Sequence, residues 1–142
     1  MRLGVDFGTT RVVVAVVDRG NYPIVTFEDP EGSSRDWFPP LVATREGEIR
    51  YGWAAWAAQF EPGWTVIRSL KRLLEDAGLC SYLDIDGRRF LLSDVLTGLA
   101  RSLFEALEQR SSVPGHAPRS FEIMLGVPAG AKRPFQLVMS IP

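Results

Sequence analysis

Residues 11–18, with the sequence RVVVAVVD, restrict the possible folds of this chain more than any other segment. The run is rich in β-branched residues, which favour a strand over a helix. Apolar residues occupy both alternating sets of positions, so the pattern predicts a strand covered on both faces. A second short apolar segment, residues 2–7, precedes it, and only Gly8-Thr9-Thr10 separates the two. These two segments are therefore predicted to form a hairpin within a sheet.

Turn residues and hydrophobic periodicity predict the remaining elements. A third strand over residues 22–28 would complete an antiparallel meander, and a last strand is expected over 121–127. Helices are expected from Gly52 to about Phe60, over 65–77, and over 94–110 with Ser93 as N-cap. Two further hairpins are predicted over 38–51, turning at Glu46-Gly47, and over 81–92, turning at Asp86-Gly87. This order indicates an α+β or α/β class with a mixed sheet.

Composition excludes several classes of function. The 142 residues carry a net charge of −1, which offers no electrostatic attraction to nucleic acid or to an acidic membrane. Cys80 is the single cysteine, so no intramolecular disulfide forms, and the single histidine, His116, lies in a Pro/Gly-rich loop that argues against a histidine-based catalytic set. No run of about 18 apolar residues and no leader are visible, so a cytoplasmic protein is expected.

Asp6 and the loop Gly8-Thr9-Thr10 carry the chemistry that the residues suggest most directly. Glycine lets the backbone approach an anion, and successive N–H groups in a tight turn form a concavity for phosphate oxygens. The threonine hydroxyls could add hydrogen bonds, and Asp6 could hold a hydrated Mg²⁺ that bridges the phosphates. An ordinary hairpin, in which Gly and Thr serve only turn geometry, is an equally good interpretation of the loop alone.

Lys71 is the second candidate. On the helix expected over 65–77 it would neighbour Ile67 and Leu74, at the border of the apolar face. A lysine there could reach a γ-phosphate or an attacking water. Spacing alone favours the simpler interpretation, in which the stem packs on apolar surface and the ammonium group stays in water.

Four segments, in this order, together resemble a known family. They are GVDFGTT at residues 4–10, YGWAA at 51–55, IRSLKRLL at 67–74 and GVPA at 126–129. The set is similar to the nucleotide-binding domain of the seventy-kilodalton heat-shock (Hsp70, DnaK-type) chaperones, within the actin-like ATPase superfamily. The resemblance implies an α/β fold with a mixed sheet of five-stranded type and flanking helices, a ribonuclease H-like lobe. Residues 1–142 would form its N-terminal lobe, with about 38–120 as the inserted subdomain.

The resemblance also implies roles for single residues. ATP or ADP with Mg²⁺ would be the ligands, with Asp6 acting on Mg²⁺ through its waters and Thr9 and Thr10 contacting the β- and γ-phosphates beside Gly8. Lys71 would position the attacking water or stabilise the transferred phosphoryl group. Pro128 would lie at a hinge that signals the nucleotide state.

The sequence departs from the family pattern after Ala129, and residues 130–136 match its continuation poorly. We therefore expect an incomplete ATP site that binds nucleotide weakly or not at all and hydrolyses it negligibly, and apolar surface that leads to self-association or awaits a second lobe or a co-chaperone. Two alternatives remain open: a non-catalytic interaction or scaffold module derived from this fold, and another actin-like ATPase.

Overall fold

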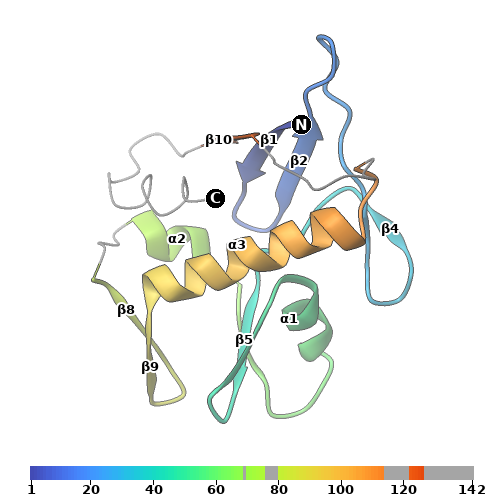
Figure 1. Cartoon of the computed structure of the whole chain (residues 1–142). Helices are drawn as coiled ribbons and strands as arrows, with labels where there is room; N and C mark the ends of the chain where they lie inside the picture. Colours follow the sequence, from blue (N-terminus) through green and yellow to red (C-terminus); the bar gives the residue numbers. More distant parts are fainter. Residues whose placement is uncertain (69, 76–79, 114–121, 127–142) are drawn as a thin grey trace.

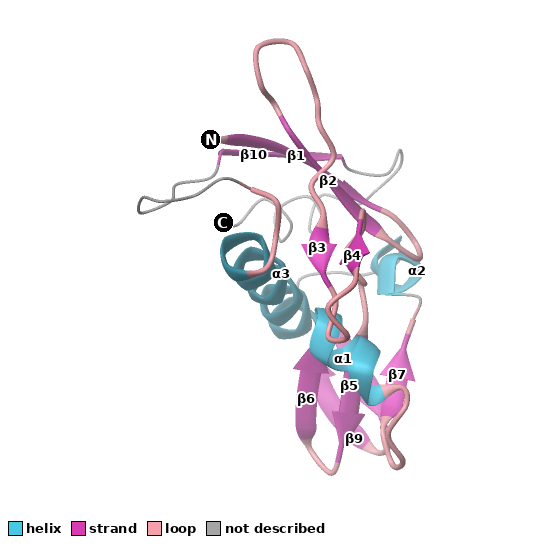
Figure 2. Ribbon diagram, turned by 90° about the vertical axis from the view of Figure 1, so that its right-hand side faces the viewer, coloured by secondary structure: helices cyan, strands magenta, loops and turns pink. Residues whose placement is uncertain are grey.

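The computed structural model describes residues 1–68, 70–75, 80–113 and 122–126. Within these residues, ten strands and three helices form a mixed α/β structure with several small sheets. The helix α3, Leu92–Gln109, crosses the molecule between a sheet that contains the N-terminal strand and a lower part built from α1, β5 and their neighbours (Figures 1 and 2). None of the helices in this part of the chain is long and apolar enough to cross a membrane.

The first sheet has the strand order β10-β1-β2. The strands β1 (Arg2–Phe7) and β2 (Val12–Val16) are antiparallel, as the hairpin prediction requires, and β10 (Glu122–Gly126) lies parallel to β1. The structure thereby joins the start of the chain to residues far along it. The antiparallel part could be predicted from the short loop, but the parallel pairing could not.

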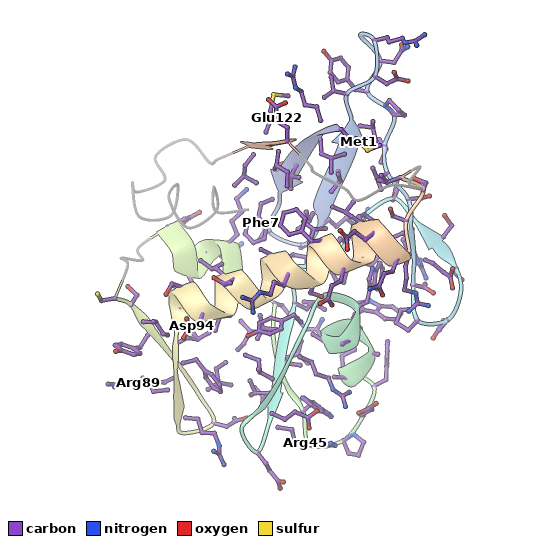
Figure 3. All side chains as sticks on the ribbon, in the orientation of Figure 1. Met1, Phe7, Arg45, Arg89, Asp94 and Glu122 are labelled. Carbon is purple, nitrogen blue, oxygen red and sulfur yellow. The ribbon has the colours of Figure 1, made fainter. Side chains whose placement is uncertain are left out.

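Only one face of this sheet is well covered. Its inner side chains pack in the main core, and Phe7 lies between β1 and α3 (Figure 3). On the other face, Val13 and Ala15 are partly exposed, and Met124 is 51% exposed. The expectation of a strand buried on both faces is therefore met on the core side alone. The buried residues of the inner face are Leu3, Val5, Phe7, Val12 and Val14.

The lower part contains a second three-stranded sheet, in the order β6-β5-β7. Its strands are β5 (Val42–Arg45), β6 (Glu48–Tyr51) and β7 (Thr65–Ile67), and the helix α1 (Gly52–Ala58) packs against β5 and β6. Two smaller hairpins complete the fold. One pairs β3 (Phe27–Glu28) with β4 (Ser34–Arg35), and the other pairs β8 (Tyr82–Ile85) with β9 (Arg88–Leu91).

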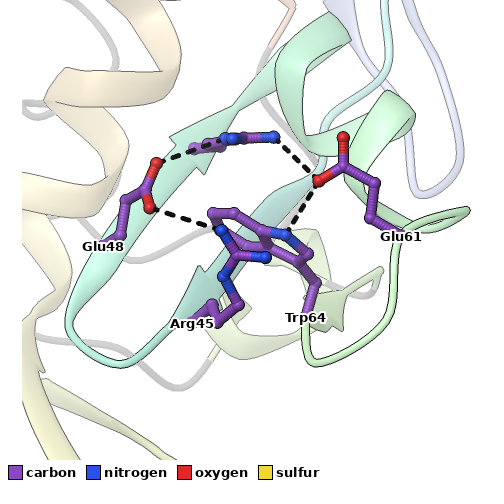
Figure 4. A network of polar contacts seen from close by, with 5 residues as sticks. Arg45, Glu48, Glu61 and Trp64 are labelled. Carbon is purple, nitrogen blue, oxygen red and sulfur yellow. Dashed lines mark hydrogen bonds and ion pairs between the residues drawn. The ribbon is translucent and has the colours of Figure 1, made fainter.

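A polar network spans β5, β6 and the segment before β7 (Figure 4). The guanidinium carbons of Arg45 and Arg50 lie 4.6 and 4.2 Å from the ring centroid of Trp64. The Trp64 indole donates to Glu61 at 3.1 Å, and Arg50 pairs with both Glu61 and Glu48. Exposed pairs of this kind contribute little stability individually, so the network chiefly fixes how Trp64 packs on the second, smaller core.

Three predicted features are wrong or incomplete. Residues 65–67 form a strand on β5, and the helix α2 covers only Leu70–Glu75, because the β-branched run Thr-Val-Ile finds strand partners in Val42, Ala43 and Thr44. Of residues 22–28, only Phe27 and Glu28 form a strand. Residues 23–25 still follow β2 through two backbone hydrogen bonds and one isolated bridge. They do not form a continuous strand, because Pro23 has no N–H to donate to a ladder.

The start of α3 is the third difference. The helix begins at Leu92, and its N-cap is Leu91 without a side-chain cap. Ser93 therefore lies inside the first turn, where its carbonyl accepts a hydrogen bond from the Thr97 hydroxyl at 2.8 Å. The apolar periodicity that predicts this helix also predicts one inner face, and on it Leu96, Leu99 and Leu107 are buried and Leu103 is partly buried.

The described strands also separate into several small sheets, where the family resemblance implied one mixed sheet of five strands. The subdomain boundaries at 38 and 120 stay a prediction. His116 and Pro128 lie outside the described residues.

Candidate phosphate-binding site

The candidate site lies at one edge of the first sheet, where β1 and β10 both end. Because these two strands are parallel, their carboxyl ends meet, and the register pairs Asp6 with Gly126. The Asp6 side chain is exposed, and its Oδ1 atom would be 3.9 Å from a methyl carbon placed on Gly126. The carboxyl edge of parallel strands is the place where ligands of α/β sheets usually bind. The fold thus brings Asp6 of the first recognised motif next to Gly126, the first residue of the last one, although the two are far apart in sequence.

The loop after Asp6 is a tight reversal that depends on a small residue at position 8. The amide of Gly8 donates to the carbonyl of Arg11 at 2.8 Å, so Thr9 and Thr10 alone make the turn. A methyl carbon placed on Gly8 would lie 2.5 Å from the Arg11 oxygen, closer than real contacts of this kind. Glycine is therefore required here by the close approach to the Arg11 carbonyl, while the predicted approach of the Gly8 backbone to an anion stays a prediction.

The backbone of Thr9 and Thr10 differs from that of an ordinary two-residue hairpin. Such hairpins favour type I′ or II′ turns, which need a positive φ at the first central residue. Among the described non-glycine residues, positive φ occurs at Arg19, Glu46 and Asp86, and at neither threonine. This geometry weakens the interpretation of the loop as a simple turn.

Three consecutive amides of the loop are available to a ligand. Within the described part of the chain, no protein group accepts a hydrogen bond from the N–H of Thr9, Thr10 or Arg11. Thr9 is partly exposed, and Thr10 and Arg11 are exposed, so these three residues lie at the surface. Successive unpaired amides in a turn form a concavity with positive partial charge, which suits phosphate oxygens.

Lys71 lies on α2, and both ribbon views place α2 beside the β1–β2 loop (Figures 1 and 2). Leu70 is fully buried and anchors the helix in the core, while Lys71 is half-buried and Arg72 exposed. The predicted neighbour at position 67 is not on this helix, because Ile67 belongs to β7. No ion pair joins Lys71 to a carboxylate among the described residues. Lys71 therefore lies near the loop on a different element, and no carboxylate among the described residues forms an ion pair with it.

Arg11 was not singled out from the sequence, yet it belongs to the same loop. Its Cζ atom lies 5.4 Å from the ring centroid of Trp37, and Trp37 packs in turn on the buried Trp53, with ring centroids 5.1 Å apart. An exposed arginine directly after a phosphate-type loop is the local signal that could have drawn attention to it. Its contact with Trp37 could not be anticipated.

A second arginine, Arg35, has its Cζ atom 5.9 Å from the ring centroid of Trp37, but its guanidinium group forms an ion pair. Its Nε atom donates to the fully buried Asp29 at 2.9 Å, and the other carboxylate oxygen accepts from the amides of Glu31 and Ser33. Burial raises the pKa of Asp29, but the Arg35 hydrogen bond and the two amides outweigh it, so the pKa lies below its ordinary value. Asp29 is therefore a structural carboxylate that closes its own loop.

The residues present fit a water-mediated role for Mg²⁺ rather than a protein cage. Within the described residues, no three His, Cys, Asp or Glu side chains gather to hold a metal ion. An exposed carboxylate such as Asp6 suits Mg²⁺, which keeps several waters and shares its other ligands with phosphates.

Comparison with known proteins points to one group of relatives. No protein-family model matches the chain. The chain is 37% identical over 71 residues to a chaperone protein HscA homolog of Colwellia psychrerythraea, a match that covers 50% of this chain. That stretch is 11% of the relative's length, so the chain corresponds to a small part of it. The likeness supports a relationship to the Hsp70 chaperones at the level of the family.

Proposed function

We propose that this chain supplies the first phosphate loop and a catalytic lysine to a chaperone-type ATPase. The observation that carries the proposal is the set of three amides at Thr9, Thr10 and Arg11, which have no acceptor in the part of the chain that the structure describes, next to the exposed carboxylate of Asp6. The partial likeness to an HscA homolog supports the chaperone class.

In this proposal the amides and hydroxyls of the loop hold the β- and γ-phosphates, and Gly8 allows the close approach. Asp6 binds the waters of Mg²⁺, which supplies charge neutralisation when bound. Lys71, from the neighbouring α2, stabilises charge on the transferred phosphoryl group or orients the attacking water. The described residues supply one phosphate loop and one lysine, so the chain alone should bind MgATP more weakly than micromolar and hydrolyse it negligibly.

Nuclear magnetic resonance tests the proposal directly, because it detects weak binding at assigned residues. MgATP, MgADP and adenosine would each be titrated to about 10 mM. This concentration is ten times a dissociation constant of about 1 mM, which corresponds to about 4 kcal/mol of binding energy. We expect the amide signals of residues 9–11 to shift with MgATP and MgADP and to stay unchanged with adenosine. If none of the three ligands shifted the amide signals of residues 9–11, the proposed site would be contradicted. A micromolar dissociation constant for MgATP would contradict the expectation that the chain alone binds nucleotide weakly.

The role of Lys71 needs a control on the same helix. Lys71→Met and Arg72→Met remove the same charge from adjacent positions of α2, one half-buried and one exposed. We expect Lys71→Met to weaken MgATP binding about three- to ten-fold, as the loss of a partly solvated charge-assisted contact implies, and Arg72→Met to leave it within two-fold. Equal effects of the two variants would remove Lys71 from the site.

A second candidate function is an interaction module, and the uncovered face of the first sheet favours it. Met124 is 51% exposed, and Ile24, bridged to Ala15 of β2, is 48% exposed. Exposed apolar side chains on neighbouring strands promote association. Light scattering of the purified chain should then show dimers or larger species, and a monomer at all concentrations would count against this candidate.

A further inference from the structure

Arg11 and Trp37 are held together by the same strand contact. Val12 and Phe38 form an antiparallel bridge with two hydrogen bonds of 2.8 Å, and both side chains are buried in the core. Arg11 directly precedes Val12 and Trp37 directly precedes Phe38, so the bridge brings these two neighbouring residues close together. The register of β1 and β2 pairs Val13 with Asp6, and continued alternation places Arg11 on the same face as Val13. The loop, Asp6 and Arg11 therefore share one face of the sheet edge.

Trp37 gives the guanidinium group a defined position without neutralising it. The Cζ–centroid distance of 5.4 Å is within the range of a cation–π contact, and Trp37 itself rests on Trp53, which is only 7% exposed. A guanidinium group lying over an aromatic face keeps the N–H donors at its edge available, and their fork matches two phosphate oxygens.

The comparison with Arg35 shows what is unusual about Arg11. Both arginines lie beside Trp37, but Arg35 pairs with the buried Asp29. Arg11 has neither an ion pair nor a side-chain hydrogen bond within the described residues. A held, exposed and unpaired cation next to three free amides is an arrangement that an anion would complete.

We propose that Arg11 is a phosphate-contacting residue of this site, in addition to the loop amides and Lys71. The inference rests on the proposed function, since it takes the ligand of the loop to be a polyphosphate group. The guanidinium group would move little from Trp37 and donate to the terminal phosphate, which would select di- and triphosphates over ligands with less charge.

Inorganic tripolyphosphate is the probe of choice, because it presents the phosphates without a nucleoside. Its affinity for the whole chain would be measured by the amide shifts of residues 9–11 in the wild type and in Arg11→Gln, Arg11→Lys and Arg19→Gln. Arg19→Gln is the matched control, because Arg19 is an exposed arginine in the two-residue turn that follows the other end of β2. The Trp37 indole N–H signal, assigned from its loss in Trp37→Phe, reports contact at the guanidinium group.

We expect Arg11→Gln to weaken binding about ten-fold, which corresponds to one charge-assisted contact, and Arg19→Gln to leave it within two-fold. Arg11→Lys should recover part of the loss, since lysine keeps the charge but not the planar fork. The Trp37 signal should shift on titration of the wild type and not of Arg11→Gln. The difference between wild type and Arg11→Gln should shrink at 1 M salt, where the screening length is about 3 Å.

The outcomes separate this inference from the proposed function. If Arg11→Gln binds as the wild type does while Thr9→Val with Thr10→Val loses affinity, the phosphate loop stands and Arg11 has no part in it. If tripolyphosphate shifts no loop amide of the wild type, both proposals fail. An equal loss in Arg11→Gln and Arg11→Lys, with a melting temperature lowered by more than about 3 °C, would assign Arg11 to packing on Trp37 and overturn the inference.

Discussion

Four two-residue reversals occur in the described part of the chain, and one of them is built differently from the other three. The turns at Arg19-Gly20, Glu46-Gly47 and Asp86-Gly87 each have positive φ at both central residues, with values between 49 and 86°. This is the geometry of type I′ turns, whose twist matches that of the flanking strands. The turn at Thr9-Thr10 has positive φ at neither residue and is closed by the contact of Gly8 with Arg11.

The difference separates turns that only reverse the chain from one that leaves donors unused. The Glu-Gly and Asp-Gly turns have residues that suit the backbone conformation of a type I′ turn. The Thr9-Thr10 turn lacks that conformation, carries two threonines that are at least partly exposed, and has no acceptor among the described residues for the amides of residues 9–11. Departures from ordinary turn geometry are expected where a ligand, rather than strand twist, is what the backbone has to fit.

The largest effect should come from Gly8→Ala. The added methyl carbon would lie 2.5 Å from the Arg11 carbonyl oxygen, so the loop would open at a cost of about 1–3 kcal/mol in unfolding free energy, and phosphate binding would be lost. Gly4→Ala is the control on β1, the strand that leads into the loop, because a methyl group there meets nothing within 4 Å. Thermal unfolding and tripolyphosphate titration give the two readouts. Equal effects at Gly4 and Gly8 would show that the loop is not specially constrained.

Thr9→Val with Thr10→Val should weaken phosphate binding about ten-fold and leave stability within about 0.5 kcal/mol, because two exposed or partly exposed hydroxyls are replaced by methyl groups of similar size. The amide signals of residues 9–11 follow binding, and chemical unfolding follows stability. Unaltered affinity would show that the two threonine hydroxyls do not contact the phosphate, whereas a large loss of stability would indicate that they have a structural role.

Gly20→Ala tests the other kind of turn. A methyl group at Gly20 meets nothing within 4 Å, but φ is +84°, so the strain of a left-handed residue should cost about 1–2 kcal/mol. Phosphate binding should not change. If Gly20→Ala and Gly8→Ala altered phosphate affinity alike, the distinction between the two kinds of turn would be lost.

The loop at residues 29–33 is the opposite case, because its amides are bound within the protein, and its contribution to stability should change only in acid. Here the amides of Glu31 and Ser33 are satisfied by the buried Asp29 carboxylate, whose pKa is below its ordinary value of about 4. The stability from this lowered pKa is complete above pH 4 and is lost as the pH falls through the lower folded value. Melting temperatures between pH 7 and pH 2 should therefore fall more steeply in acid for the wild type than for Asp29→Asn. Parallel curves would contradict this assignment.

The sequence predicted the local features of the fold well. The Glu-Gly and Asp-Gly turns, the β1–β2 hairpin and the inner face of α3 all follow from the types of neighbouring residues. The segment 65–67 shows the limit, since its apolar spacing fits a helix and a strand equally, and only the open edge of β5 decides between them. Ser93 is a similar case, because a good capping residue does not determine where the helix begins.

The candidate site could be predicted only in its local part. Asp6, Gly8, Thr9 and Thr10 are recognisable because their spacing is short. The neighbourhood of Asp6 and Gly126, the position of α2 beside the loop and the contact of Arg11 with Trp37 depend on tertiary packing between distant segments. A residue of the site that acts through such a contact cannot be read from a local pattern.

The parallel pairing of β1 with β10 also bears on how the chain is made. Arg2 pairs with Glu122, so β1 leaves the ribosome about 120 residues before its outer neighbour. At bacterial and eukaryotic elongation rates this interval is roughly 6–24 s, during which the β1–β2 hairpin presents an open edge with unpaired amides and carbonyls. Misfolding during synthesis should therefore begin at this edge, and the loop at residues 8–11 should reach its final surroundings only after β10 has been made.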